Sequence, residues 1–389
     1  MLAMTSLIKR ELKALWNDPW QLALISYIPL LGIFCIWWLF SAALPRHLPV
    51  AVVDMDNTSL SRSLTRRIEA NPAARVLSYS DLASAKRAML QADVYAMVVI
   101  PQSIRRDMLT GRQPGIDIRY NSQFLLVGKL LSSQIQQSLA DGLRDVARQK
   151  QLSMGIPKVQ AELQMQPLQT QVTALYNHNS NYVVFLLPPV LIALGQLMAM
   201  LIFANSLNRE LRQNTMRDWF SHGIWRGIGV KAIVYVPLVV MQGRLILALL
   251  YQFLGLPLAG TFGQLLVAQL VMLVAIWLLV VAIFFLLQDC ARVISFCSAL
   301  FAPAFPFMGI TFPTHDMPML AQWWRKLMPS SHYIDSHIGL VSYGQAWPQL
   351  FEQLTDYWGY SLLIPLIIVL AIKVRDGIFA DQNALAGGV

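Results

Sequence analysis

The stretch at 264–287, "QLLVAQLVMLVAIWLLVVAIFFLL", decides the fold class, because it carries no charged side chain over a length that can cross a bilayer. A transmembrane helix needs roughly 20 mostly apolar residues, and with this stretch five or six segments of the chain qualify. Together they predict a polytopic α-helical membrane protein. The six expected transmembrane helices are 20–44, 181–205, 357–373 and, within 229–312, the segments 229–254, 264–287 and 293–312.

The composition agrees with a membrane protein. The chain is 56% hydrophobic and 13% charged, with a mean hydropathy of +0.50, whereas soluble domains carry roughly 25% charged residues. Its three cysteines lie in or beside apolar runs without metal-ligand spacing, which favours a role as small apolar side chains. The net charge of +9 is spread over many segments and does not indicate nucleic-acid binding.

The distribution of basic residues predicts the orientation. If the N-terminus is inside, the short inside segments hold 11 Lys and Arg residues, and the short outside segments hold only Arg325 and Lys326. Inside loops are enriched in Lys and Arg, so both termini, including the tail at 374–389, are expected in the cytoplasm. The first apolar run is too long for the core of a cleaved signal peptide and carries Trp20 and Trp38 near its ends, as interfacial anchors do.

The segment at 45–180 is long and polar, and it lies outside the cytoplasm in this orientation. Short apolar runs at 49–55, 75–79, 94–100 and 115–120 read as strands, and the stretches that follow them read as helices. Strands that alternate with helices predict an α/β domain with a substantially parallel sheet.

One motif in this segment has two interpretations. "VAVVDMDNTSL" at 50–60 places Asp54 and Asp56 at the end of a strand, as in the nucleophile loop of haloacid-dehalogenase phosphatases. Such an enzyme also needs a phosphate-binding Lys and further acids for Mg²⁺, and no recognisable motif supplies them. In the other interpretation the aspartates end the strand and begin the next helix, where Asp, Asn, Thr and Ser are favoured caps.

Three further segments have an expected place. Residues 1–19 form an amphipathic helix, closed by "NDP", that should lie on the inner membrane surface. The charged segment 206–228 should connect two spans on the cytoplasmic side. Prolines divide 313–356 into apolar pieces too short to cross, which indicates re-entrant or interfacial helices outside.

Arg244 is the most conspicuous single residue, because it lies near the middle of the third expected span, close to Gln242. A charge at this depth costs about 2.5–3.5 kcal/mol on insertion scales, so it should face protein or water. Arg244 and Gln242 could belong to a pathway or a subunit interface. It could also pair with helix carbonyls or with a polar neighbour such as Gln196 or Gln269.

The order of these parts resembles the permease subunits of type-2 ABC exporters, in the branch with a large extracytoplasmic domain after the first span. "LIKRELKALWNDP" (7–19) is similar to the elbow helix of that family, and 50–70 is similar to its first outer strand and helix. "NRELRQNTMRDW" (208–219) resembles its coupling segment, with Asn214 in place of a glycine. "MGITFPTHDMPMLAQWWRKLMPSSHYID" (308–335) resembles its G-x-x-F-P-x-x-x-M-P signature and is the most specific match.

The resemblance implies roles for particular residues. Residues expected to couple the spans to an ATPase are Arg10, Glu11, Arg209, Glu210, Arg212, Met216 and Trp219. Residues expected to shape the exit are Gly309, Phe312, Pro313, Met317, Pro318 and Pro329.

The resemblance also implies partners and a function. A cytoplasmic P-loop ATPase would hold ATP and Mg²⁺, while this chain would bind no cofactor and would not itself be an enzyme. A second permease, identical or a sister subunit, would complete the transporter in the lipids of a bacterial inner membrane, with a periplasmic adaptor as a further partner. The cargo would be a hydrophobic or amphipathic molecule, such as a drug or lipid. The alternatives are a secondary transporter, a membrane-anchored surface or sensor protein, and a D-x-D phosphatase.

Overall fold

The computed structural model describes residues 2–41, 46–102, 104–109, 115–121, 125–155, 181–221 and 223–386. The chain divides into two compact units. The helical unit combines Met1–Ser41 with Asn181–Val389, and the α/β unit is Ala42–Ser180. Residues 156–180, at the end of the expected outer domain, lie outside the described residues.

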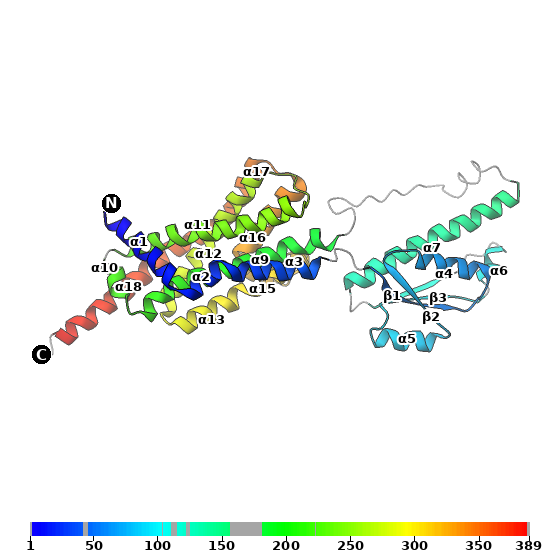
Figure 1. The fold of residues 1–389 in the computed structure, drawn as a ribbon, viewed down its shortest axis with the longest axis horizontal. Helices are drawn as coiled ribbons and strands as arrows, with labels where there is room; N and C mark the ends of the chain where they lie inside the picture. Colours follow the sequence, from blue (N-terminus) through cyan, green and yellow to red (C-terminus); the bar gives the residue numbers. More distant parts are fainter. Residues whose placement is uncertain are drawn as a thin grey trace. The chain divides into compact units, whose positions relative to one another are not determined.

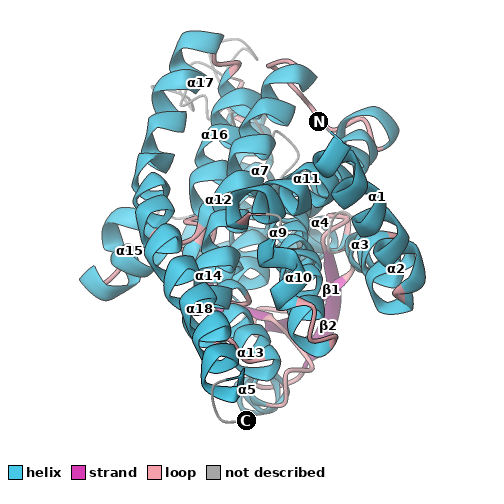
Figure 2. Ribbon diagram, turned by 90° about the vertical axis from the view of Figure 1, so that its left-hand side faces the viewer, coloured by secondary structure: helices cyan, strands magenta, loops and turns pink. Residues whose placement is uncertain are grey.

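The helical unit is built from helices and loops alone in its described part (Figure 2). Its first half consists of α1 (Leu2–Asn17), α2 (Pro19–Ile25), α3 (Tyr27–Phe40), α9 (Tyr182–Arg212), α10 (Met216–Ser221), α11 (Ile224–Ala248), the π-turn η2 (Leu249–Phe253) and α12 (Phe262–Leu287). Its second half consists of α13 (Cys290–Phe301), α14 (Ala304–Phe307), η3 (Thr314–Asp316), α15 (Met319–Lys326), α16 (Pro329–Tyr343), α17 (Trp347–Leu354), η4 (Thr355–Leu362) and α18 (Leu363–Ala386).

Six stretches of the described chain are long and apolar enough to cross a membrane. They are Pro19–Phe40, Val183–Arg212, Ile224–Phe253, Phe262–Leu287, Cys290–Phe307 and Trp347–Ile378. The fifth stretch ends at Phe307, because Gly309 takes a positive φ of 86° and turns the chain. The sixth stretch begins at Trp347, earlier than the expected 357. Its last helix, α18, continues to Ala386, so most of the expected tail at 374–389 is helical.

The helix α12 lies at the centre of the unit and packs against α9, α11, α16 and α18. Lipid tails are as apolar as leucine, so such packing depends on close contact and on polar side chains between helices. The expected re-entrant segment contributes to this core through α16, where Tyr333, Ile334 and Leu340 are all buried.

The first span is broken at Ser26, between α2 and α3. Pro29 has no N–H, so the carbonyl of Ile25 lacks its usual helical donor. Gln242 of α11 replaces that donor: its Nε2 donates to Ile25 O at 2.7 Å and to Leu24 O at 3.1 Å. A break in a membrane helix is tolerated when a neighbouring helix satisfies the freed backbone groups in this way.

The α/β unit has a four-stranded sheet in the order β2-β1-β3-β4. The strands are β1 (Leu48–Asp54), β2 (Ala74–Tyr79), β3 (Ala96–Ile100) and β4 (Asp117–Tyr120), and the helices are α4 (Ser59–Glu69), α5 (Leu82–Leu90), α6 (Ile104–Leu109) and α7 (Leu125–Ser153). Three strands are parallel as expected, whereas β4 pairs antiparallel with β3.

Both faces of this sheet are covered. Val50 and Val52 of β1 face the side of α4 and α7, whereas Ala51 and Val53 face the side of α5 (Figure 1). A strand that is buried on both faces reads as a continuous apolar run, which is why "VAVV" could be recognised from the sequence.

Candidate functional site

Four charged side chains meet where α1, α9 and α11 pack together. They are Glu11, Arg209, Glu210 and Lys231, and none is more than 3% exposed. We call these four residues the charge cluster. Lys231 lies 3.2 Å from a Glu11 oxygen and 2.9 Å from Glu210 Oε1, and Arg209 pairs with Glu11. The cluster therefore links one residue of α1, two of α9 and one of α11.

Neighbouring polar groups add hydrogen bonds to the ion pairs of the cluster. Arg209 Nη1 donates to the Tyr235 hydroxyl at 3.0 Å, and Lys231 Nζ donates to Ser206 O at 2.8 Å. Glu210 Oε2 accepts from the Thr215 hydroxyl at 2.5 Å and from Arg10 at 2.6 Å. Charges can remain buried at this density only because each one has such partners.

The cost of separating buried charges determines the mechanical role of the cluster. A buried ion pair adds little net stability over a well-packed apolar pair, but removing one partner leaves an uncompensated charge and costs about 3–5 kcal/mol. The cluster therefore fixes the position of α1 relative to α9 and α11 much more strongly than it stabilises the unit. A force applied to α1 would be transmitted to both spans.

A groove of about 600 Å³ adjoins the cluster. It lies between α1, the start of α2 and the end of α9, and is lined by Arg10, Lys13, Ala14, Asn17, Asp18, Pro19, Arg209, Arg212, Gln213 and Thr215. The side chains of Arg10 and Arg212 are 33% and 43% exposed. Arg209 is buried against Glu11, and Arg212 lies 3.6 Å from Asp18, the one acidic side chain on the wall. Arg10, Lys13 and Arg212 are the basic side chains that remain accessible, which makes the groove suited to an acidic surface.

The short helix α10 is anchored by its aromatic side chains. Trp219 stacks on Phe285 at an interplanar angle of 2°, with centroids 6.1 Å apart. It also sits over Gly227, where an added Cβ would lie 2.3 Å from Trp219 Nε1. Lys231 Nζ lies 5.6 Å from the centre of the Trp219 ring, which connects α10 to the charge cluster.

The structure brings together four of the seven residues expected to couple the spans to an ATPase. Arg10, Glu11, Arg209 and Glu210 share one network, and Arg212 lines the adjoining groove. Met216 and Trp219 are buried anchors of α10. Because α9 continues to Arg212, residues 206–212 are helical, and Glu11, Arg209 and Glu210 face the interior of this chain.

Other residues were missed by sequence reasoning. Arg217 and Asp218 are exposed on α10, where a partner can reach them, and Lys231 and Tyr235 are buried in the cluster network. One signal for Lys231 was present, because a single lysine in the apolar run "GIGVKAIVYV" requires acidic partners.

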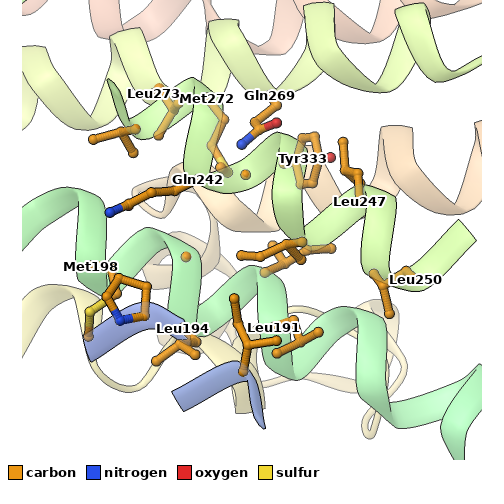
Figure 3. Close-up of a pocket in the computed structure, with 17 residues that line it drawn as sticks. Leu191, Leu194, Met198, Gln242, Leu247, Leu250, Gln269, Met272, Leu273 and Tyr333 are labelled. Carbon is orange, nitrogen blue, oxygen red and sulfur yellow. The ribbon is translucent and has the colours of Figure 1, made fainter. Parts of the chain in front are cut away.

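Arg244 lies on the outward face of α11, between the exposed side chains of Met241 and Leu245. Of the two partners considered for it, Gln196 instead accepts a hydrogen bond from Ser330 N at 2.8 Å, and Gln269 (Figure 3) packs against Gly243 on the buried face of α11. Gln242, two residues away, faces inward and caps the broken first span.

The residues expected to shape an exit follow one another through a turn instead of lining one cavity. An added Cβ at Gly309 would lie 2.5 Å from Thr314 Cγ2, so the turn requires glycine. Met317 is buried, and Phe312 is 64% exposed. Pro318 precedes α15, Pro313 precedes η3, and Pro329 begins α16.

The D-x-D motif makes local hydrogen bonds. Asp54 Oδ1 accepts from the N–H groups of Asp56 and Asn57, both at 3.0 Å. Asp56 accepts from the Thr58 hydroxyl at 2.5 Å, and Thr58 caps α4 through Ser61 N. Within the described ranges, no three His, Cys, Asp or Glu residues are grouped so that they could hold a metal ion. These contacts are those of a strand end and a helix cap.

Comparison with known proteins identifies a family. No curated protein matches the chain. One solved structure, titled "Crystal structure of a domain of a putative ABC type-2 transporter from Thermotoga maritima MSB8", is 21% identical, with a TM-score of 0.24 over 31% of this chain and 81% of its own. The family model described as "ABC-2 family transporter protein" matches residues 19–373, and the chain therefore belongs to the ABC-2 family of transporter proteins.

Proposed function

We propose that this chain is the permease subunit of an ATP-driven exporter, and that it moves hydrophobic or amphipathic molecules out of the cytoplasm or the inner leaflet of a bacterial inner membrane. The observation that carries the proposal is the charge cluster, in which Glu11 of α1 is paired with Arg209 of α9 and Lys231 of α11. An ABC-2 membrane subunit works with a partner ATPase, so its spans need a mechanical connection to that partner.

The groove beside the cluster is the proposed docking surface for the ATPase. Arg10 is common to both: it lines the groove and pairs with Glu210 at 2.6 Å. A partner that presses on α1 or on the groove would therefore act directly on the end of α9. ATP and Mg²⁺ would be held by the partner, whose closure on ATP would move α1, α9 and α11 together.

The proposal includes an orientation of the chain in the membrane and a second subunit. The excess of Lys and Arg in the segments near α1, α10 and α18 supports a cytoplasmic groove and an outer α/β unit. Arg244 faces outward from α11 among apolar side chains, and a charge at membrane depth needs a cover of protein or water. A second permease subunit, identical or a sister, is the proposed cover. The outer α/β unit would guide cargo or dock an adaptor.

The test is purification of the native complex from membranes, followed by mass spectrometry. A soluble P-loop ATPase should be recovered with the chain. The variant Arg212→Glu, in the wall of the groove, should lower its recovery at least about tenfold, because it places a like charge against an acidic partner. The matched control is Arg66→Glu, at an exposed position of α4 in the α/β unit. Recovery of the chain without any ATPase would contradict the proposal, and equal loss in both variants would contradict the docking site.

A further inference from the structure

The helix α1 has a face that is both basic and apolar. Four exposed side chains follow one another at the i, i+3, i+4, i+7 spacing of a single helix face, and they are Lys9, Leu12, Lys13 and Trp16. We call these four residues the outward face of α1. The opposite side of the helix is held in the charge cluster through Glu11, which is buried. The outward face is exposed in the part of the chain that the structure describes, so it is open to a partner.

The charge on the outward face is positive only. Residues 1–26 contain two acidic side chains, and both are engaged elsewhere: Glu11 in the charge cluster, and Asp18 at 3.6 Å from Arg212. Within the described ranges, neither Lys9 nor Lys13 has an acidic partner. Side chains four positions apart on a helix have Cβ atoms about 5–6 Å apart, and like charges at this spacing repel. An anion that contacts both lysines would remove this repulsion.

Two tryptophans indicate the depth at which the outward face meets the membrane. Trp16 is 77% exposed, and Trp20, at the start of α2, is 56% exposed. Tryptophan is favoured at the boundary between lipid and water, where its ring is apolar and its N–H can stay wet. The first span begins at Pro19, and α1 turns away from the line of α2 and α3 (Figure 1). The outward face therefore meets the bilayer at the level of the lipid headgroups.

We propose that the outward face of α1 binds acidic phospholipids, whose phosphate groups contact Lys9 and Lys13 and whose acyl chains lie beside Trp16. A zwitterionic headgroup carries a cation of its own, whereas an acidic headgroup presents a net negative charge to the two lysines. The inference rests on the proposed function only where it places α1 beside the cytoplasmic leaflet. Lipid binding needs no ATPase, so it can fail while the docking groove is confirmed, and the groove can fail while lipid binding is confirmed.

Lys9 provides the test, because it belongs to the outward face and does not line the docking groove. Lys9→Gln removes the charge and keeps a long side chain that suits a helix. Lys9→Arg keeps the charge. Lys86→Gln is the matched control, because Lys86 is an exposed lysine of α5 in the α/β unit. All three variants change exposed positions, so their melting temperatures should match that of the unaltered chain.

The measurement is the quenching of a fluorophore by brominated lipids, on the full chain in phosphatidylcholine nanodiscs. The fluorophore is attached at Thr5→Cys, an exposed position one turn before Lys9, in a chain without Cys35, Cys290 and Cys297. Brominated phosphatidylglycerol or brominated phosphatidylcholine is then added in increasing fractions. The acidic lipid should quench at a fraction at least about tenfold lower, because one lysine beside an acidic headgroup gives about a fivefold preference.

The variants and the salt concentration decide the outcome. Lys9→Gln should lower the preference for the acidic lipid about fivefold, while Lys9→Arg and Lys86→Gln should keep it. Added salt should weaken the preference, because exposed charges are screened. Equal quenching by the two lipids, an unchanged preference in Lys9→Gln, or a preference that salt does not affect would overturn the proposal. If neither lipid quenches the fluorophore and only the partner ATPase shields it, the outward face belongs to that partner and the proposal is wrong.

Discussion

The turn that contains Asp54 and Asp56 in the α/β unit and the charge cluster of the helical unit both depend on acidic side chains. They differ in how far along the chain the partners of those side chains lie. Asp54 accepts hydrogen bonds from residues two and three positions ahead in the chain. Glu11 instead pairs with residues 198 and 220 positions away, and Glu210 with one 200 positions away. The turn therefore shapes only its own surroundings, whereas the cluster holds separate elements together.

Burial explains why losing a partner should matter more in the charge cluster than in the turn. Asp54 and Asp56 are half-buried, so water can replace a lost partner. Glu210 and Lys231 are both 0% exposed, so a lost partner leaves a charge that water cannot reach. The same chemical change should therefore have a large effect in the cluster and a small one in the turn.

Glu210→Gln should have the largest effect. It removes one of the two carboxylates that pair with Lys231 and the carboxylate that pairs with Arg10, and leaving buried charge uncompensated costs about 3–5 kcal/mol. The melting temperature of the purified chain should fall strongly. Asp218→Asn, at an exposed acid of α10, is the control and should stay within about 0.5 kcal/mol of the unaltered chain. Equal melting temperatures of the two variants would contradict the expectation that the charge cluster tolerates a lost carboxylate less well than the surface does.

Arg244→Leu should have an intermediate effect, on coupling and not on folding. Leucine is favourable at membrane depth, so insertion and melting should be unchanged or improved. If a second subunit covers Arg244, cargo-stimulated ATP hydrolysis by the complex should fall at least about fivefold. Unchanged stimulation would leave Arg244 without a part in coupling.

Thr58→Ala should have a small and local effect. It removes the side-chain cap of α4, which is typically worth about 1 kcal/mol. Hydrogen exchange of the α4 amides should become about fivefold faster, while the amides of α9 and α11 keep their protection. Faster exchange in the helical unit would mean that the effect of the turn extends beyond the α/β unit.

Asp54→Asn should have the smallest effect. The Asn side-chain oxygen can still accept from the N–H groups of Asp56 and Asn57, so exchange in the turn should be unchanged. Hydrolysis of a phosphate ester by the purified chain, if present and abolished by this variant, would instead support the phosphatase interpretation.

The sequence predicted best where contacts are local or where one physical property suffices. The run at 264–287 requires a lipid environment, and the "VAVV" strand and the Thr58 cap follow from neighbouring residues. Hydropathy alone placed the end of the second span at 205, whereas α9 continues to Arg212. The cause is that Arg209 and Glu210 find partners in α1 and α11, which no local pattern contains.

The packing of Gln242 and Gln269 was beyond sequence reasoning for the same reason. Gln269 appeared only as a polar neighbour for Arg244. In the structure Gln269 packs against Gly243 of another helix, and Gln242 donates to the carbonyls that the break at Ser26 leaves free. Resemblance in the order of motifs identified the family, but it did not separate the buried Glu11 from the exposed Arg217.

We infer that the charge cluster makes α1, α9 and α11 move as one body. The most direct measurement is the distance distribution between spin labels at Lys9→Cys of α1 and Arg226→Cys of α11, both exposed, in a chain without Cys35, Cys290 and Cys297. We expect one narrow distribution that ATP leaves unchanged in the complex, and a broad one in the folded fraction of Lys231→Met. An equally narrow distribution in Lys231→Met would contradict it.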